Sequence, residues 1–148
     1  MNNTINLSTI GFTKKTAKEF FELLQKAKVK RIIDTRLNNI SQLAGFAKRN
    51  DLQYFLKEIA NIDYIHLLDL SPTQEILDDY KKKKGEWSIY EQKFRELMVK
   101  REIEKKLDPD LLQDSCLLCS EAKPHYCHRR LVAEYLRDHW GNINIYHL

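Results

Sequence analysis

The chain has 148 residues with a formal net charge of +4, and its sequence pI is about 8.9. Hydrophobic residues make up 43% and charged residues 31% of it, which excludes an intrinsically disordered chain and is ordinary for a globular domain. No apolar run approaches the ~20 residues of a membrane helix, and the amino terminus carries no basic and apolar signal segment. We therefore expect one cytoplasmic domain over residues 1–148, without membrane contact, whose mild positive charge tolerates an anionic partner.

Strand-like and helix-like patterns alternate in the first half of the chain. Ile5–Gly11 is typical of a first strand, and Thr13 is placed to cap a helix whose apolar face runs through residues 17–27. Val29–Asp34 is a compact apolar run that indicates a buried strand. The polar residues 35–50 that follow it indicate the longest loop.

The alternation continues to the carboxyl terminus. Asp51 is placed to cap a second helix over residues 52–59, and Thr73 stands at the start of a third. A further helix begins at Trp87, whose helical spacing with apolar partners assigns it to the core. The other expected elements are a strand at Tyr64–Leu68, a strand at Cys116–Cys119, a helix at Leu131–Trp140 and a last strand at Ile143–Tyr146.

Alternation of this kind favours a parallel sheet with helices on both faces. We predict an α/β fold, a single three-layer Rossmann-like (flavodoxin-like) domain with a mostly parallel sheet of about five strands. The sequence leaves the strand order open. In such sheets, ligands bind beyond the carboxyl ends of the strands, so the residues that follow each strand are the first candidates for a site.

Asp34 and Arg36 follow the second expected strand. Their spacing of two lets both side chains point to one side of the sheet. Arg36 can then bind an anion while Asp34 orients it or acts as a base. A purely structural ion pair at the strand end fits the same pattern equally well.

The segment from Cys119 to Arg130 carries the strongest local signal. Cys127 falls at or just before the start of a helix, where unpaired N–H groups and the helix dipole favour a thiolate. The same helix start is suited to hold a phosphate or carboxylate, beside Arg129 and Arg130. Cys119 and Cys127 are thus candidate nucleophiles and Glu121 is a candidate acid or base. A cysteine that is merely packed under the loop is the alternative at Cys127.

The sequence contains three cysteines, and an odd number in a reducing compartment favours free thiols over disulfides. Cys116, Cys119, Cys127 and His128 are zinc-type ligands. Strand alternation, however, sends Cys116 and Cys119 to opposite faces, and two neighbours on a helix start point about 100° apart. We therefore predict free cysteines, no bound metal and no cofactor.

Three motifs resemble those of the DUF488 family, a domain of unknown function. They are Thr9-Ile10-Gly11, Asp34-Thr35-Arg36, and Leu118-Cys119-Ser120-Glu121 together with Cys127-His128-Arg129-Arg130-Leu131-Val132-Ala133-Glu134. The resemblance extends over essentially the whole chain and implies a Rossmann-like α/β fold. It implies no reaction, because the name of the family records none.

The first functional hypothesis is an enzyme that acts on an anionic, phosphate-bearing substrate such as a nucleotide or nucleic acid. Its catalytic candidates are Asp34, Glu121, Cys127 and Cys119, and its substrate-binding candidates are Gly11, Thr13, Arg36, His128, Arg129 and Arg130. His125 and Tyr126, in the loop before the last helix, are also expected to touch a substrate. The alternative is a non-catalytic module that binds a nucleotide or nucleic acid in the same pocket. A third interpretation is an interior salt-bridge network that fixes the loops.

Overall fold

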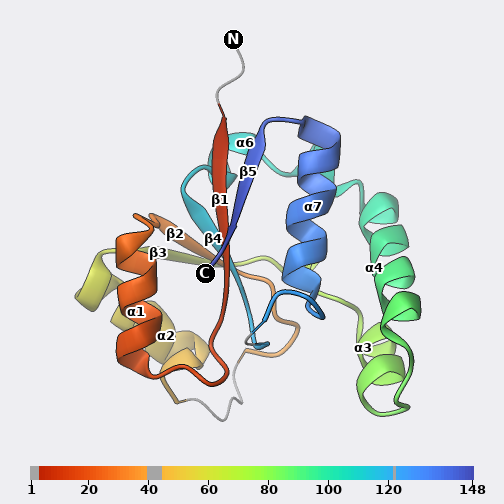
Figure 1. The fold of residues 1–148 in the computed structure, drawn as a ribbon, viewed down its shortest axis with the longest axis horizontal. Helices are drawn as coiled ribbons and strands as arrows, with labels where there is room; N and C mark the ends of the chain where they lie inside the picture. Colours follow the sequence, from red (N-terminus) through yellow and green to blue (C-terminus); the bar gives the residue numbers. More distant parts are fainter. Residues whose placement is uncertain (1–3, 40–44, 122) are drawn as a thin grey trace.

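The structure is a computed structural model that describes residues 4–39, 45–121 and 123–148 (Figure 1). It contains a five-stranded sheet in the order β3-β2-β4-β1-β5, and all neighbouring strands are parallel. The strands are β1 (Ile5–Gly11), β2 (Arg31–Asp34), β3 (Asp63–His66), β4 (Ser115–Cys119) and β5 (Ile143–His147). The prediction of an α/β fold with a parallel five-stranded sheet is confirmed.

Helices cover both faces of the sheet, which gives the fold three layers (Figure 1). One face carries α1 (Ala17–Lys26) and α2 (Arg49–Phe55), and the other carries α4 (Trp87–Arg101) and α7 (His128–Trp140), with α3 (Gln74–Lys81) beside α4. The short helical segments are η1 (Gly45–Ala47), η2 (Leu56–Ala60), η3 (Leu68–Leu70), α5 (Ile103–Lys106) and α6 (Pro109–Leu112). Of the helices that the structure describes, none is long and apolar enough to cross a membrane.

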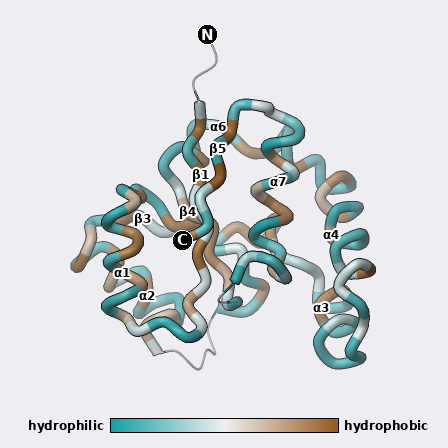
Figure 2. The backbone as a smooth tube through the Cα atoms, viewed as in Figure 1, coloured by the Kyte–Doolittle hydropathy of each residue, from teal (hydrophilic) through white to brown (hydrophobic). Residues whose placement is uncertain are grey.

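Successive strand residues pack into different cores. Ile32 and Leu118 pack with α1 and α2, whereas Ile33 and Leu117 pack with α4 and α7. Figure 2 shows hydrophobic segments in the strands and in the helices on both sides of them. Because strand side chains alternate between faces, a strand that is apolar at every position is stable only when both faces are covered.

Two helices begin differently from the prediction. Thr16, and not Thr13, caps α1, where its hydroxyl and the carboxylate of Glu19 form a capping box. The N-cap of α2 is Lys48, which makes no side-chain cap, and Asp51 lies in the first turn of that helix. In both cases the observed N-cap lies three positions from the expected one. Residues three apart lie on the same side of a helix.

The carboxyl ends of β1, β2 and β4 meet at one edge of the sheet. Gly11 of β1 lies opposite Cys119 of β4, and Asp34 of β2 lies opposite Leu118. This register brings the residues that follow three separate strands to one region, as the general rule for parallel sheets requires.

Candidate functional site

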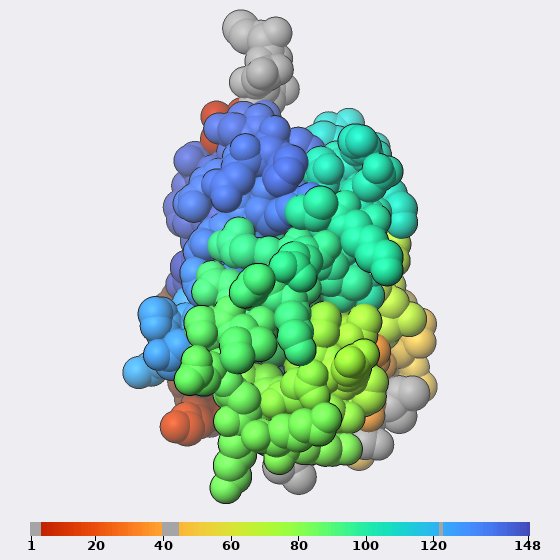
Figure 3. Space-filling view, turned by 90° about the vertical axis from the view of Figure 1, so that its right-hand side faces the viewer, coloured from red at the N-terminus to blue at the C-terminus, as the bar shows by residue number. Residues whose placement is uncertain are grey.

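A cavity of about 280 Å³ opens at this edge, between the ends of β2 and β4 and helices α3, α4 and α7. Figure 3 views the molecule from the side of these helices, with α3 in yellow-green, α4 in green and α7 in blue. The described residues that line the cavity are Arg36, Leu37, Asn38, Pro72, Leu77, Tyr80, Lys81, Trp87, Tyr90, Cys119, Ser120, Glu121, Tyr126, Cys127 and His128. Segments that are far apart in the sequence therefore surround one space.

One side of the cavity is an aromatic wall, made of Tyr80, Trp87, Tyr90 and Tyr126. Trp87 stacks on Tyr90 with ring centroids 4.8 Å apart, and Tyr80 and Tyr126 each meet Trp87 edge-on at 5.5 Å. Tyr90 is buried whereas Tyr126 is 55% exposed, so the wall runs from the core to the solvent. Trp87 packs against the core, as predicted, and also faces the cavity. Such a wall suits a flat, apolar part of a ligand.

The rim of the cavity is polar. Lys81, at the end of α3, places its Nζ atom 2.7 Å from Oε1 of Glu121, and both side chains are about half exposed. The two charges come from segments forty residues apart and face the solvent, where an ion pair contributes little to stability. A ligand could therefore replace the contact between Lys81 and Glu121 at a small cost in free energy.

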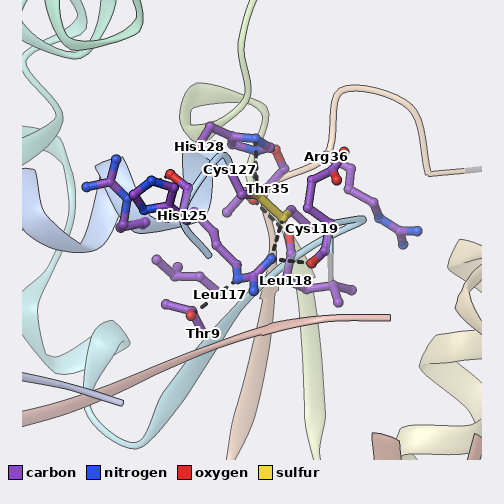
Figure 4. The surroundings of a disulfide bond; sticks show 12 residues. Thr9, Thr35, Arg36, Leu117, Leu118, Cys119, His125, Cys127 and His128 are labelled. Carbon is purple, nitrogen blue, oxygen red and sulfur yellow. Dashed lines mark hydrogen bonds between the residues drawn. A yellow bond between two sulfur atoms is a disulfide. The ribbon is translucent and has the colours of Figure 1, made fainter. Parts of the chain in front are cut away.

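Cys119 and Cys127 are joined as a disulfide at the base of the cavity (Figure 4). The end of β4 and the residue before α7 meet there, and both cysteines are nearly fully buried. The prediction of free cysteines is not confirmed for this pair, whereas Cys116 is a free thiol. Cys116 packs in the core on the α1 side, where burial raises the pKa of its thiol, so it is not a nucleophile.

His128, the first residue of α7, is held by a single ring nitrogen. Its Nε2 atom lies 2.7 Å from the carbonyl oxygen of Thr35 and 3.0 Å from the hydroxyl of the same residue. Because a carbonyl only accepts hydrogen bonds, Nε2 carries the proton and Nδ1 is left as an acceptor. Burial lowers the pKa of His128 to about 4, and the charge of Arg129 contributes to the same shift. The hydrogen bond to Thr35 acts in the opposite direction but is outweighed, so the ring is neutral.

The sulfur atoms of Cys119 and Cys127 and a ring nitrogen of His128 lie within 4.8 Å of one another. Nδ1 of His128 is 4.0 Å from Sγ of Cys127, which differs from the predicted divergence of these neighbours. The reason is that Cys127 is the N-cap of α7 and has an extended backbone (φ −139°, ψ 140°). The 100° rotation between neighbours applies only inside a helix.

Arg129 is fully buried and ties the motifs together. Its Nε donates to the hydroxyl of Thr9, and its Nη1 donates to the carbonyl of Glu121 and approaches Sγ of Cys119 at 3.0 Å. Gly11 permits this arrangement, because a Cβ atom there would stand 1.5 Å from the carbonyl oxygen of Glu121. Burial lowers the pKa of Arg129 to about 10, which leaves it charged at neutral pH. Its contacts hold the loop between β4 and α7.

Asp34 and Arg36 form a buried ion pair at the end of β2, and Arg36 also lines the cavity. Oδ1 and Oδ2 of Asp34 accept from Nε and Nη2 of Arg36 at 2.9 and 2.8 Å, and the carboxylate also accepts from Tyr64 and Asn39. The guanidinium lies over the ring of Phe12 and points away from the disulfide in Figure 4. Burial by itself would raise the pKa of Asp34, but the hydrogen bonds and charge of Arg36 outweigh it and lower that pKa.

The sequence model of the family described as "Domain of unknown function DUF488" matches residues 16–136. The chain belongs to the DUF488 family. No curated protein and no solved structure matches it. The matched region of this DUF488 chain includes all the described residues that line the cavity.

The predicted site residues of the DUF488 chain fall into two groups. Cys119, Glu121, Cys127, Arg36 and His128 are among the described residues that line the cavity. The remaining predicted residues, which are Asp34, Gly11, Thr13, Arg129 and Arg130, lie outside that lining.

The excluded residues have other contacts. Thr13 is exposed, and its backbone N–H donates to the carbonyl of Ser120. Arg130 pairs with Glu134 and Glu91 along the α7–α4 contact. Gly11, Arg129 and Asp34 are buried in the networks described above. The structure therefore gives these residues scaffold contacts and no direct contact with the cavity.

Sequence reasoning missed most of the aromatic wall. Tyr80, Trp87 and Tyr90 carry helical core spacing, which does not distinguish a buried face from the lining of a pocket. The only available signal was their position, since Tyr80 directly precedes the four consecutive lysines of residues 81–84 and Trp87 begins a helix. Of the two loop residues expected to touch a substrate, Tyr126 is among the described residues that line the cavity and His125 is not.

Proposed function

We propose that this DUF488 chain binds a nucleotide, or one base of a single-stranded nucleic acid, in the cavity at the sheet edge. The observation that carries the proposal is the aromatic wall of Tyr80, Trp87, Tyr90 and Tyr126. Bases of every kind stack on aromatic side chains, and each stacked base contributes about 1–3 kcal/mol.

The size and charge of the cavity support the same ligand class. Its volume of about 280 Å³ is near the lower end of the range for small-molecule pockets, ~300–1,000 Å³, and suits one base with its sugar. Lys81 stands at the rim, and the amino-terminal end of α7 carries the positive end of a helix dipole beside Cys127. Both favour an anionic group such as a phosphate.

Binding is favoured over catalysis by the state of the predicted catalytic groups. Asp34 is fully buried in its ion pair, and Cys119 and Cys127 are bonded to each other. A general base must reach its substrate, and a nucleophilic sulfur must be a thiolate. The enzyme remains the second candidate because Glu121 lines the cavity and is about half exposed.

The binding proposal is tested with a protein in which Trp87 is the only tryptophan. Since the chain has two tryptophans, Trp140→Phe provides this reporter, and Trp140 lies outside the described lining of the cavity. Titrations with a nucleoside, a nucleoside monophosphate, a short single-stranded oligonucleotide and inorganic phosphate should change the Trp87 emission for the base-containing ligands. Calorimetry on the unsubstituted chain provides the affinities. If neither the emission nor the heat responds to any base-containing ligand, the proposal is wrong.

The enzyme alternative requires a separate measurement. The chain is incubated with nucleotides and oligonucleotides, and chromatography follows the release of phosphate, base or shortened product. Turnover that disappears in Glu121→Gln, while ligand affinity stays within about threefold, would favour the enzyme. Binding without turnover would favour the module.

A further inference from the structure

We propose that Cys119, Cys127 and His128 of the reduced chain bind one Zn²⁺ ion, with the fourth coordination position open to the cavity. This inference goes beyond the proposed nucleotide site and does not depend on it. Two sulfurs and one imidazole form a donor set that prefers zinc among the common divalent cations.

The three donor atoms already lie close together. They come from the end of β4, from the N-cap of α7 and from its first residue, and all lie within 4.8 Å of one another. A tetrahedral zinc ion with bonds of about 2.0–2.3 Å spaces its donors by roughly 3.3–3.8 Å. Reduction of the disulfide removes the bond that holds the two sulfurs closer together than that spacing.

The imidazole of His128 is prepared for coordination. Its Nε2–H donates to the carbonyl of Thr35 at 2.7 Å, so its lone pair is on Nδ1, the atom that lies 4.0 Å from Sγ of Cys127. Metal-bound histidines almost always donate their second ring N–H to a carbonyl or carboxylate, which fixes the tautomer and the ring orientation. The contact with Thr35 has this geometry.

Both sulfurs have surroundings that stabilise thiolates. Nη1 of Arg129 approaches Sγ of Cys119 at 3.0 Å, and hydrogen bonds from a guanidinium favour the charged form of a thiol. Cys127 occupies the N-cap of a thirteen-residue helix, where the dipole favours negative charge. Cys116 lies within β4 and packs in the core on the α1 side, so it does not lie at the start of α7.

The backbone spacing of the cysteines fits a shared metal ion. Their Cα atoms are 7.5 Å apart, whereas disulfide-bonded cysteines usually have Cα atoms about 4.4–6.8 Å apart. Two thiolates that bind one metal ion have sulfurs farther apart and suit a wider backbone spacing. A phosphine reductant supplies the two electrons that open the disulfide and becomes the phosphine oxide, while one water supplies the oxide oxygen and the two thiol protons; zinc binding then releases those protons from the thiols.

The site has the composition of a zinc site with an open position. Among the described residues only these three donors form such a group, and all three line the cavity. Three protein ligands and a free position are typical of zinc sites that bind a water or a substrate atom, whereas purely structural sites have four protein ligands. A ligand in the cavity would therefore reach the metal directly.

The test uses the full chain purified with a phosphine reductant and without nucleotides. Zinc content is measured by atomic emission, and zinc affinity by competition with a chromophoric chelator. Cobalt is then substituted for zinc, because two thiolate ligands produce a thiolate-to-cobalt charge-transfer band. We expect one zinc per chain and that band.

Variants assign the ligands. Cys119→Ala, Cys127→Ala and His128→Asn should each weaken zinc binding by more than about tenfold, and the two cysteine variants should weaken the charge-transfer band. Cys116→Ala is the matched control, since it removes a cysteine three residues from Cys119 whose side chain lies across the sheet. It should keep full zinc content and the cobalt band. Zinc should also raise the melting temperature of the wild type and of Cys116→Ala, but not that of the ligand variants.

Several outcomes would overturn the proposal. The first is a reduced wild type that takes up no zinc or cobalt. The second is zinc binding that survives in both Cys119→Ala and Cys127→Ala. The third is a loss of zinc binding in Cys116→Ala equal to that in Cys119→Ala. If a ligand variant fails to fold, the cobalt spectrum of the wild type and of Cys116→Ala still decides. The nucleotide titration read by Trp87 is carried out on metal-free protein, so the two proposals succeed or fail separately.

Discussion

The guanidinium of Arg36 binds both carboxylate oxygens of Asp34 on the α1 side of the sheet, with the pair almost completely removed from solvent. The residues of the motif Asp34-Thr35-Arg36 thus make two separate sets of contacts. Its charged residues form a network with Tyr64 and Asn39, whereas Thr35, between them, orients His128 on the cavity side. Nη1 of Arg36 has no hydrogen-bond partner among the residues that the structure describes, which adds to the cost of burying this pair.

We expect Arg36→Met to destabilise the chain by about 3–5 kcal/mol, because it leaves the carboxylate of Asp34 buried without its cation. The double variant Asp34→Asn/Arg36→Met should lose much less than the sum of the single losses, since the two residues interact directly. Asp63→Asn is the control, because the Asp63–Lys57 pair is largely exposed and should cost less than about 1 kcal/mol. Urea unfolding measures the wild type, Asp34→Asn, Arg36→Met, the double variant and Asp63→Asn. Additive losses at Asp34 and Arg36 would contradict the expected coupling.

The stability of the chain should depend on pH through Asp34. Its pKa in the folded chain is lower than the unfolded value of about 3.9, so the unfolded chain binds the proton more readily. The stabilisation is therefore complete above the unfolded pKa and is lost as the pH falls through the folded pKa. The difference in unfolding free energy between the wild type and Asp34→Asn should be constant near neutral pH and shrink below about pH 4. A difference that grew on acidification would show that the sign is wrong.

Gly11→Ala should be among the most damaging small substitutions in the chain. The added methyl group would stand 1.5 Å from the carbonyl oxygen of Glu121 and 2.9 Å from Nη1 of Arg129, so the loop after β4 must move. We expect a loss of at least about 3 kcal/mol in unfolding free energy, the upper end of overpacking effects. Among the described residues, Gly45→Ala has no heavy atom within 4 Å of its new Cβ, and it should change stability by less than about 1 kcal/mol. Equal losses would show that the approach of Glu121 to Gly11 does not limit the fold.

Lys81 should distinguish nucleotides from nucleosides. If it contacts the phosphate, Lys81→Ala weakens binding of a nucleoside monophosphate several-fold and leaves binding of the nucleoside unchanged. Added salt should reduce the same difference in the wild type. Lys82→Ala is the matched control, since Lys82 follows in the same run, pairs with Asp78 and is not among the described residues of the cavity lining. Calorimetry with both ligands provides the comparison, and equal effects of the two lysine variants would argue against a phosphate contact.

The fold was predictable because its strands contain consecutive apolar residues, a pattern that is typical of strands covered on both faces. Val29–Asp34 and Cys116–Cys119 carry that pattern, and turn and cap residues separate them from helical spacing. The edge at which the site lies followed from the same topology. Cys116 and Cys119 were also assigned correctly to opposite faces, because alternation is a local property.

The composition of the site was less predictable because it depends on the relation between strands. Asp34 lies opposite Leu118, so its side chain shares the face of Leu118 while Cys119, one residue later, faces the cavity. That register requires the strand order, which one sequence does not contain. The aromatic wall depends in turn on where α3 and α4 pack. The approach of His128 to Cys127 depends on a non-helical N-cap backbone.

Tyr126 provides the sharpest test of the aromatic wall. It is 55% exposed and contacts Trp87 edge-on, so its removal should leave the core intact while taking away one surface for a base. Because a stacked base is worth about 1–3 kcal/mol, Tyr126→Ala should weaken nucleoside and nucleotide binding by roughly 5- to 150-fold. Tyr146→Ala removes a tyrosine of similar exposure, 49%, from β5, outside the described lining of this cavity, and should leave the affinity unchanged. Melting curves check that both variants are folded. An affinity that is the same in both would place the base away from Tyr126 and leave the wall without the stacking role that we assign to it.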